Sequence, residues 1–267
     1  MRNRLSPLEE AFPKRKRPLL MTGLVVGDPF LEATEDYMRT VVEAGADVVE
    51  LIMPFSDAAY HGPVLRRACR RAMSEEVSWR ELEELIARFR EVNGQTPIVV
   101  ASYYNRIIAR GMKRCVEGLR EAGADAVVVT DLPDEEAESF RRQVEEHQMV
   151  LVQTVAPTTP TRRFRRLASR ARGLLLWTGH SGAEVGVEID EFRQRLKELR
   201  QYTELPIVAS MNVESGRDAA VVTEAAHGVE VSSSLAWLIE GKGPNIEERL
   251  QAFVADLRSS LDAGAGQ

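Results

Sequence analysis

Residues 43–53 read EAGADVVELIM, in which Gly45 is followed by a short turn and then by the apolar run Val48–Met53. Glycine is the usual residue just past a helix end, because it adopts the left-handed conformation without steric penalty. The pattern returns at residues 121–127, EAGADAV, and more faintly at residues 224–229, EAAHGV. A helix that repeatedly leads into a buried strand indicates alternating α and β units.

Short apolar runs and amphipathic helical patterns alternate along the chain. Near-continuous apolar strands are typical of parallel sheets covered by helices. Such units in 267 residues predict an α/β fold, a (β/α)8 TIM barrel that forms a single domain over residues 1–267 with a short N-terminal helix. A flavodoxin-like open sheet is the alternative, but eight units favour closure. The runs are residues 19–26, 48–53, 97–102, 126–130, 150–155, 173–178, 206–210 and 228–232.

The composition is that of an ordinary globular protein, with 44% hydrophobic residues, 28% charged residues and a formal net charge of −6. This charge gives no electrostatic footprint for nucleic acid, and no apolar run approaches the ~20 residues that span a bilayer. We therefore expect neither a nucleic-acid nor a membrane partner. Cys69 and Cys115 lie in helical patterns, and the chain lacks the hydrophobic region of a signal peptide, which predicts a reduced, cytoplasmic setting.

Glu50 interrupts the second apolar run. A strand has a period of two, so Glu50 points to the same apolar side as Val48 and Ile52. A buried charge there costs several kcal/mol unless it is paired or neutralised. Glu50 is therefore either a structural acid satisfied by a local partner or an acid/base group with a raised pKa. The turn-rich loop that follows, residues 54–63, favours the catalytic interpretation.

Polar side chains also follow other predicted strands, at the end where a TIM barrel carries its chemistry. Tyr103 follows the third strand and Asp131 the fourth. Trp177 ends the sixth strand, where it either stacks on a planar substrate or fills the barrel rim. The last three strands lead into polar turns, residues 179–186 (GHSGAEVG), 210–212 (SMN) and 232–234 (SSS).

These motifs resemble the tryptophan synthase alpha subunit family. The family signature is an acid on strand 2, then Leu-Gly-x-Pro-Phe-Ser-Asp-Pro and a second acid before Gly-Pro. The chain carries Glu50 and then Leu51, Pro54, Phe55, Ser56, Asp57, Gly62 and Pro63 at the matching positions. The likeness runs from residue 20 to about residue 250 and includes Gly27-Asp28-Pro29, Tyr103-Tyr104-Asn105, Asp131-Leu132-Pro133 and Pro157-Thr158-Thr159.

The resemblance implies a TIM-barrel carbon–carbon lyase that needs no cofactor. In the family, the strand 2 acid protonates C3 of the indole ring of indole-3-glycerol phosphate. The second acid assists deprotonation at the ring nitrogen, and retro-aldol cleavage yields indole and glyceraldehyde 3-phosphate. With Glu50 in place, we expect acid/base cleavage of an indole-glycerol-phosphate-like or related small substrate, with altered specificity. A non-catalytic homologue that binds a ligand or a partner subunit is the alternative.

Two departures from the family fall on catalytic positions. His61 stands in place of the second acid, and Glu184 in place of the threonine that partners that acid. Because the two positions are in contact in the family, we expect a His61–Glu184 pair, in which the carboxylate raises the imidazole pKa. An exposed loop histidine is the alternative. A metal site built from these residues with His180 and Glu50 is a further alternative, but no short ligand spacing supports it, and we expect no metal.

The phosphate site of the family has also changed. Its Gly-Phe-Gly after strand 7 is residues 210–212, SMN, and its Gly-Ser after strand 8 is Ser232-Ser233. Side chains there crowd a phosphate that glycine would admit. We expect substrate contacts from Tyr103, Asp131, Trp177 and His180, and weakened anion binding from Gly182, Asn212, Ser232 and Ser233. The altered loop over residues 58–60 makes a beta-subunit complex doubtful.

Overall fold

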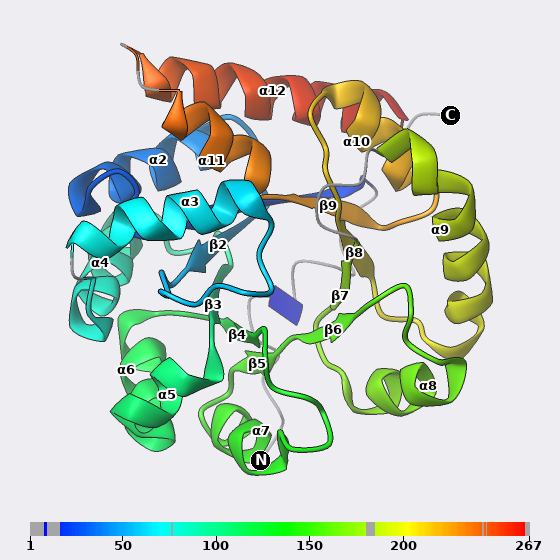
Figure 1. The fold of residues 1–267 in the computed structure, drawn as a ribbon, viewed down its shortest axis with the longest axis horizontal. Coiled ribbons are helices and arrows are strands. Elements are labelled where there is room, and N and C mark those ends of the chain that lie inside the picture. The colour runs from blue at the N-terminus through cyan, green and yellow to red at the C-terminus, as the bar shows by residue number, and fades with distance from the viewer. Residues whose placement is uncertain are drawn as a thin grey trace.

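The computed structural model describes residues 8–9, 17–75, 77–179, 185–241, 243 and 245–264. Parallel strands form a ring, and helices surround it (Figure 1). The strands are β1 (Leu19–Val25), β2 (Val48–Ile52), β3 (Ile98–Ser102), β4 (Ala126–Val129), β5 (Val150–Leu151), β6 (Gln153–Val155), β7 (Leu175–Thr178), β8 (Ile207–Ser210) and β9 (Gly228–Val231). The helices are α2 (Leu31–Glu43), α3 (Pro63–Ala72), α4 (Trp79–Val92), α5 (Tyr104–Arg110), α6 (Met112–Ala122), α7 (Glu138–Glu146), α8 (Thr161–Arg170), α9 (Val185–Leu199), α10 (Gly216–Thr223), α11 (Ser233–Glu240) and α12 (Ile246–Gly264).

The order of the strands confirms the predicted (β/α)8 barrel. The sheet runs β5-β4-β3-β2-β1-β9-β8-β7-β6, and each hydrogen-bonded pair is parallel. β5 and β6 lie at opposite ends of this order, yet only Val152 separates them along the chain. The run predicted as one strand over residues 150–155 is thus interrupted where its pairing passes from β4 to β7. The two halves together close the ring.

Side chains alternate between two apolar layers, and this alternation positions the site. In β2, Val48 and Ile52 belong to the cluster inside the barrel, whereas Val49 and Leu51 belong to the cluster between strands and helices. Glu50 lies between Val48 and Ile52 in the same alternation and therefore faces the barrel interior. The fold itself places a carboxyl group among apolar side chains.

The repeated EAGAD motif has a structural function at the amino-terminal ends of the strands. Asp47 precedes β2 and accepts a hydrogen bond from the Leu20 N–H at 3.0 Å. Asp125 precedes β4 and accepts one from the Ile98 N–H at 2.8 Å. In the fainter third copy, His227 Nδ1 accepts from an N–H of the neighbouring strand in the same way, at 3.0 Å from Ile207 N. The repeat therefore supplies hydrogen-bond acceptors to backbone N–H groups at the amino-terminal ends of neighbouring strands.

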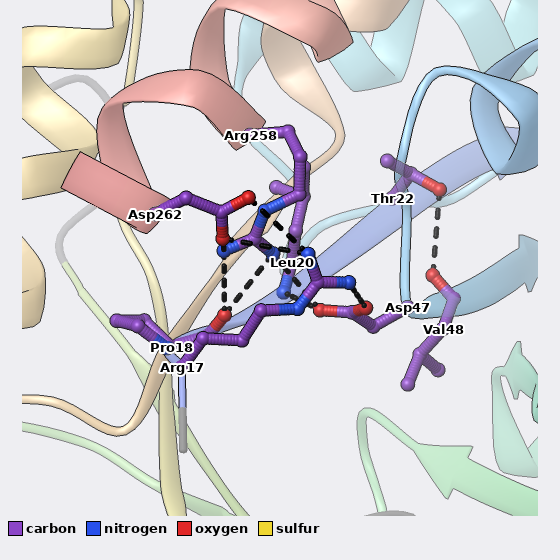
Figure 2. Close-up of polar contacts among 8 residues, drawn as sticks. All are labelled: Arg17, Pro18, Leu20, Thr22, Asp47, Val48, Arg258 and Asp262. Atoms are coloured by element: carbon purple, nitrogen blue, oxygen red, sulfur yellow. Dashed lines mark hydrogen bonds and ion pairs between the residues drawn. The ribbon is translucent and has the colours of Figure 1, made fainter. Parts of the chain in front are cut away.

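Asp47 also joins the two ends of the chain (Figure 2). Its carboxylate pairs with Arg17 at 3.0 Å and with Arg258 of α12 at 3.1 Å. Arg258 further donates to the Pro18 carbonyl at 3.1 Å and pairs with Asp262 at 2.6 Å. Asp47 is 4% exposed and Arg258 is 7% exposed. This cluster, buried at Asp47 and Arg258, connects α12 to the first two strands.

Of the predicted N-terminal helix, only Leu8 and Glu9 belong to the described residues, and both are helical. Leu8 is fully buried in the cluster inside the barrel. Glu9 pairs with Arg172 at 2.9 Å. In the part of the chain that the structure describes, no helix is long and apolar enough to cross a membrane.

Candidate active site

Two adjoining cavities open at the carboxyl ends of the strands. The first, here called the Glu50 cavity, has a volume of about 200 Å³ and is lined by Glu50, His61, Ser210 and Glu230 among others. The second, here called the Asp131 cavity, has a volume of about 500 Å³ and extends over Asp131 and residues 156–159. The two cavities adjoin at the lining residues that they share. The shared residues are Tyr60, Thr130, Thr154, Thr178 and Gly179.

Glu50 is 5% exposed and lines the Glu50 cavity. Burial, together with the nearby carboxylate of Glu230, raises the pKa of Glu50 well above its usual range. No Lys or Arg lines this cavity among the described residues. The expected burial and raised pKa are confirmed, and they favour the protonated acid that a proton donor requires. The catalytic role itself remains a prediction.

Glu230 is a second buried acid in the same cavity, and the sequence reasoning missed it. It lies in the middle of β9 and is 3% exposed. The Ser210 hydroxyl donates to Glu230 Oε2, whereas Oε1 has no hydrogen-bond partner among the described residues. Burial raises the pKa of Glu230. The signal was available, because an acid inside the apolar run 228–232 is the same feature that identified Glu50.

His61 lies at the rim of the Glu50 cavity with its ring partly buried. The ring meets Tyr103 edge-on at a centroid distance of 5.5 Å, and Nδ1 is 4.0 Å from Cys69 Sγ. Burial lowers the pKa of His61 to about 4. This direction is opposite to the one expected from a carboxylate partner. Glu184 lies outside the described residues, so the predicted His61–Glu184 pair does too.

We predict that His61 of the ligand-free protein is neutral at pH 7. Burial lowers its pKa to about 4, so the folded protein binds this proton less readily than the unfolded chain, whose histidine pKa is ~6.5. The stability contributed by the neutral imidazole is present above pH 6.5 and is lost as the pH falls towards 4. NMR titration of the His61 ring would measure this, and a midpoint above 6.5 would instead favour a carboxylate partner.

Tyr103 was expected to contact substrate, but neither of the two cavities is lined by its side chain. Tyr103 is 3% exposed and stacks on Phe55 at a centroid distance of 4.8 Å. Its hydroxyl accepts a hydrogen bond from the Tyr60 N–H at 3.2 Å. Tyr103 therefore supports the loop after β2. Asp131 does line its cavity, and it accepts a hydrogen bond from the Tyr104 N–H at 2.6 Å.

Trp177 requires a correction. It was expected to stack on a planar substrate, but its side chain is 2% exposed and packs edge-on against Phe192 of α9, with ring centroids 5.5 Å apart. Its neighbours Leu176 and Thr178 line the Glu50 cavity instead. Because successive residues of a strand point to opposite faces, Trp177 must face the helices.

The candidate anion site lies where α11 begins. Ser232 and Ser233 line the Glu50 cavity, and Ser232 is 7% exposed. Asn212 lines the same cavity and donates to Glu214 at 2.9 Å. His180 and Gly182, which were expected to bind substrate and anion, lie outside the described residues. The described residues contain no group of three or more His, Cys, Asp or Glu side chains that could hold a metal ion.

A closed parallel barrel whose second strand directs a buried, uncompensated acid into a cavity at the carboxyl ends of the strands has the architecture of a TIM-barrel enzyme. The family model described as "Tryptophan synthase alpha chain" matches residues 10–264. The chain belongs to this family, whose members are carbon–carbon lyases that cleave indole-3-glycerol phosphate.

Relatives of known name agree with this assignment. The chain is 32% identical to the tryptophan synthase alpha chain of Laribacter hongkongensis over 263 residues, which cover 98% of this chain and 100% of that one. It is 36% identical to that of Xanthomonas euvesicatoria over 251 residues, covering 92% and 94%. The crystal structure of tryptophan synthase subunit alpha from Legionella pneumophila superimposes with a TM-score of 0.88 at 28% identity, covering 97% and 100%. A chain of the tryptophan synthase complex from Pyrococcus furiosus gives 0.84 at 25% identity, covering 91% and 99%.

Proposed function

We propose that this chain cleaves a carbon–carbon bond of an indole-glycerol-phosphate-like substrate by acid/base retro-aldol chemistry, with Glu50 as the acid. The observation that carries this proposal is the state of Glu50. It is buried, lines a cavity at the carboxyl end of the barrel, and has a raised pKa without a cation beside it among the described residues. Such a group keeps a proton at a pH where an exposed glutamate has lost it.

The geometry supports a short reaction sequence. Glu50 donates its proton to ring carbon 3, which makes the ring an electron sink. A base in the cavity then takes the proton of the side-chain hydroxyl, and the hydroxyl carbon becomes an aldehyde as the bond between ring and side chain breaks and its electron pair returns to the ring. In this sequence His61, which lines the cavity and has a lowered pKa, accepts a hydrogen bond from the ring N–H. No step requires a cofactor.

The altered turns support a change in specificity. Ser232, at the position of the family's glycine, presents a side chain where a phosphate would approach the backbone closely. The start of α11 still offers N–H groups and hydroxyls to an anion. The carboxylate of Glu230 opposes a dianion, because it faces the cavity without a compensating cation among the described residues. These features favour a substrate with a smaller charge than indole-3-glycerol phosphate.

We expect weak turnover of indole-3-glycerol phosphate. Its kcat should fall below the ordinary enzyme range of ~1–10³ s⁻¹, and indole-3-glycerol, which lacks the phosphate, should have an equal or higher kcat/KM. Indole release by the purified protein measures both. A kcat for the phosphate ester within the ordinary range would show that the changed turns leave phosphate binding intact. Absence of cleavage of either compound would contradict the proposed function.

We further infer that the chain works in the cytoplasm without a beta subunit. Its two cysteines, Cys69 and Cys115, are both free and buried, as expected in a reducing compartment.

The loop that touches the beta subunit in the family is changed here. Its Tyr60 is 65% exposed, and its backbone N–H is bound to Tyr103. The same indole-release assay, run with and without a tryptophan synthase beta subunit, should give equal rates.

A further inference from the structure

Glu50 and Glu230 approach each other inside the barrel, over a position of β1 that has no side chain. They lie on β2 and β9, which flank β1 on either side. Between them β1 carries Gly23, which pairs in register with Glu50. A Cβ atom on Gly23 would lie 2.8 Å from Glu230 Oε1 and 3.1 Å from Glu50 Oε2. The two carboxyl groups therefore share the space that a side chain at position 23 would fill.

Gly23 lies in the interior of β1. Glycine weakens a strand at such a position, and it often marks a place where another group approaches the backbone closely. Here the approaching groups are the two carboxyls and Ser232, whose Cβ would lie 2.7 Å from a Cβ on Gly23. No hydrogen bond joins Glu50 to Glu230 in the described structure, and Glu230 Oε1 is buried without a partner. An unpartnered carboxyl oxygen therefore lies beside the candidate acid.

The surroundings do not compensate two negative charges. The residues around Glu50 and Glu230 are uncharged on three elements. They are Gly23 of β1, Ser210 of β8, and Ser232 and Ser233 at the start of α11. The titratable groups that face the two acids from the loop after β2 are His61 and Tyr60. The opposite wall carries threonines and apolar side chains, and no Lys or Arg lines the cavity among the described residues. Two like charges this close in a desolvated site cannot both form cheaply, so one proton is retained.

We propose that Glu230 is a second catalytic residue, which holds one proton jointly with Glu50 and acts as the base while Glu50 acts as the acid. This assignment rests on the proposed function. It concerns the described residues of the cavity and does not require His61 or residues 180–184.

The hydrogen bonds decide which carboxyl has which role. The Ser210 hydroxyl donates to Glu230 Oε2, and this bond stabilises the ionised form of Glu230. The described residues offer Glu50 no such donor, and its pKa is raised further by the charge of Glu230. Glu50 therefore retains the proton and Glu230 is the carboxylate.

Glu50 and Glu230 together supply and remove every proton of the cleavage, so no outside proton source is needed. Glu50 gives its proton to ring carbon 3, and Glu230 removes the proton of the side-chain hydroxyl. The carbon–carbon bond breaks, its electron pair returns to the ring, and the hydroxyl carbon becomes an aldehyde. Glu50 is now ionised and Glu230 protonated. Transfer of that proton from Glu230 to Glu50 restores the starting state.

The proton sharing can be measured without substrate. NMR titration of the side-chain carboxyl carbons of Glu50 and Glu230 in the ligand-free protein should show two steps, the upper one from Glu50. In Glu230→Gln the Glu50 midpoint should fall by about one pH unit or more, because the neighbouring charge is gone. Should Glu230→Gln fail to fold, Glu50→Gln provides the second test, since the upper step must vanish. An unchanged Glu50 midpoint in Glu230→Gln, or an upper step that persists in Glu50→Gln, would overturn the shared proton.

The catalytic role needs a separate measurement on indole-3-glycerol or its phosphate. Glu230→Gln should lower kcat about 10²-fold or more and remove the acidic limb of the kcat–pH profile, because that limb reports the base. Glu84→Gln, on the outer helix α4 with its side chain 50% exposed, is the matched control and should leave rate and profile unchanged. Full activity in Glu230→Gln with both limbs intact would overturn the role of Glu230 and leave the proposed function standing. A wild-type protein that cleaves neither compound would overturn the proposed function and the role of Glu230 together, while the titration still decides the shared proton.

Discussion

Replacing Glu50 by glutamine should lower kcat for carbon–carbon cleavage about 10²–10⁴-fold, the usual contribution of a positioned general acid. Glutamine has nearly the same shape, so the cavity is retained, but its amide cannot donate a proton to a ring carbon. Glu50 is 5% exposed and lines the Glu50 cavity, so the substitution acts on the reacting groups directly. Indole release under saturating substrate measures the change. A kcat within tenfold of wild type would exclude Glu50 as the acid.

The same variant should be more stable than wild type at high pH. Burial and Glu230 raise the pKa of Glu50, so the folded state keeps a proton that the unfolded chain, with a glutamate pKa of ~4.3, releases. Stability is therefore lost as the pH rises from ~4.3 through the folded-state pKa. Glu50→Gln lacks this cost, and its melting temperature should exceed that of wild type at pH 8 and match it more closely at pH 4. A lower melting temperature at pH 8 would mean that Glu50 is a structural acid.

Replacing Asp47 by alanine should destabilise the fold by about 3–5 kcal/mol, the usual effect of removing one partner of a buried ion pair. Asp47 binds Arg258 at 3.1 Å, Arg17 at 3.0 Å and the Leu20 N–H at 3.0 Å. Its loss leaves the buried guanidinium of Arg258 undercompensated and a strand amide without its acceptor. Denaturant unfolding measures the loss as a lower midpoint.

Asp262→Ala is the control for Asp47→Ala. Asp262 pairs with Arg258 as well, but its side chain is 46% exposed, so its removal should cost no more than ~1 kcal/mol. Asp125→Ala should resemble Asp47→Ala, because Asp125 binds Arg90 and the Ile98 N–H, each at 2.8 Å. Equal effects of Asp47→Ala and Asp262→Ala would show that burial does not govern this cluster.

Local sequence patterns were sufficient for the elements and for Glu50. Period-two burial and helix-ending glycines depend on residues a few positions apart, so they can be read along the chain. An acid inside an apolar run is such a local signal. Glu230 has the same signal and was nevertheless missed, because no matching family motif drew attention to residues 228–231.

Roles that depend on direction or distance were less predictable. Trp177 ends a strand, but whether it faces the cavity or the helices follows from the alternation of its neighbours Leu176 and Thr178. Tyr103 follows a strand as a substrate-binding residue would, yet it packs on Phe55 under the loop. The expected pKa direction of His61 assumed a carboxylate beside it, whereas burial in the described structure lowers that pKa to about 4.

The sequence by itself determined the alternation of strands and helices, the closure of eight units into a barrel, and the burial of Glu50, since each follows from local periodicity and composition. Only the tertiary structure decided that Glu50 and Glu230, 180 positions apart in the chain, meet across Gly23. Barrel closure sets β2 and β9 on either side of β1, and a strand position without a side chain leaves the space in which two carboxyls come together. The raised pKa of each acid is a consequence of that enclosure, because charge is costly where water is excluded and no cation lines the cavity among the described residues.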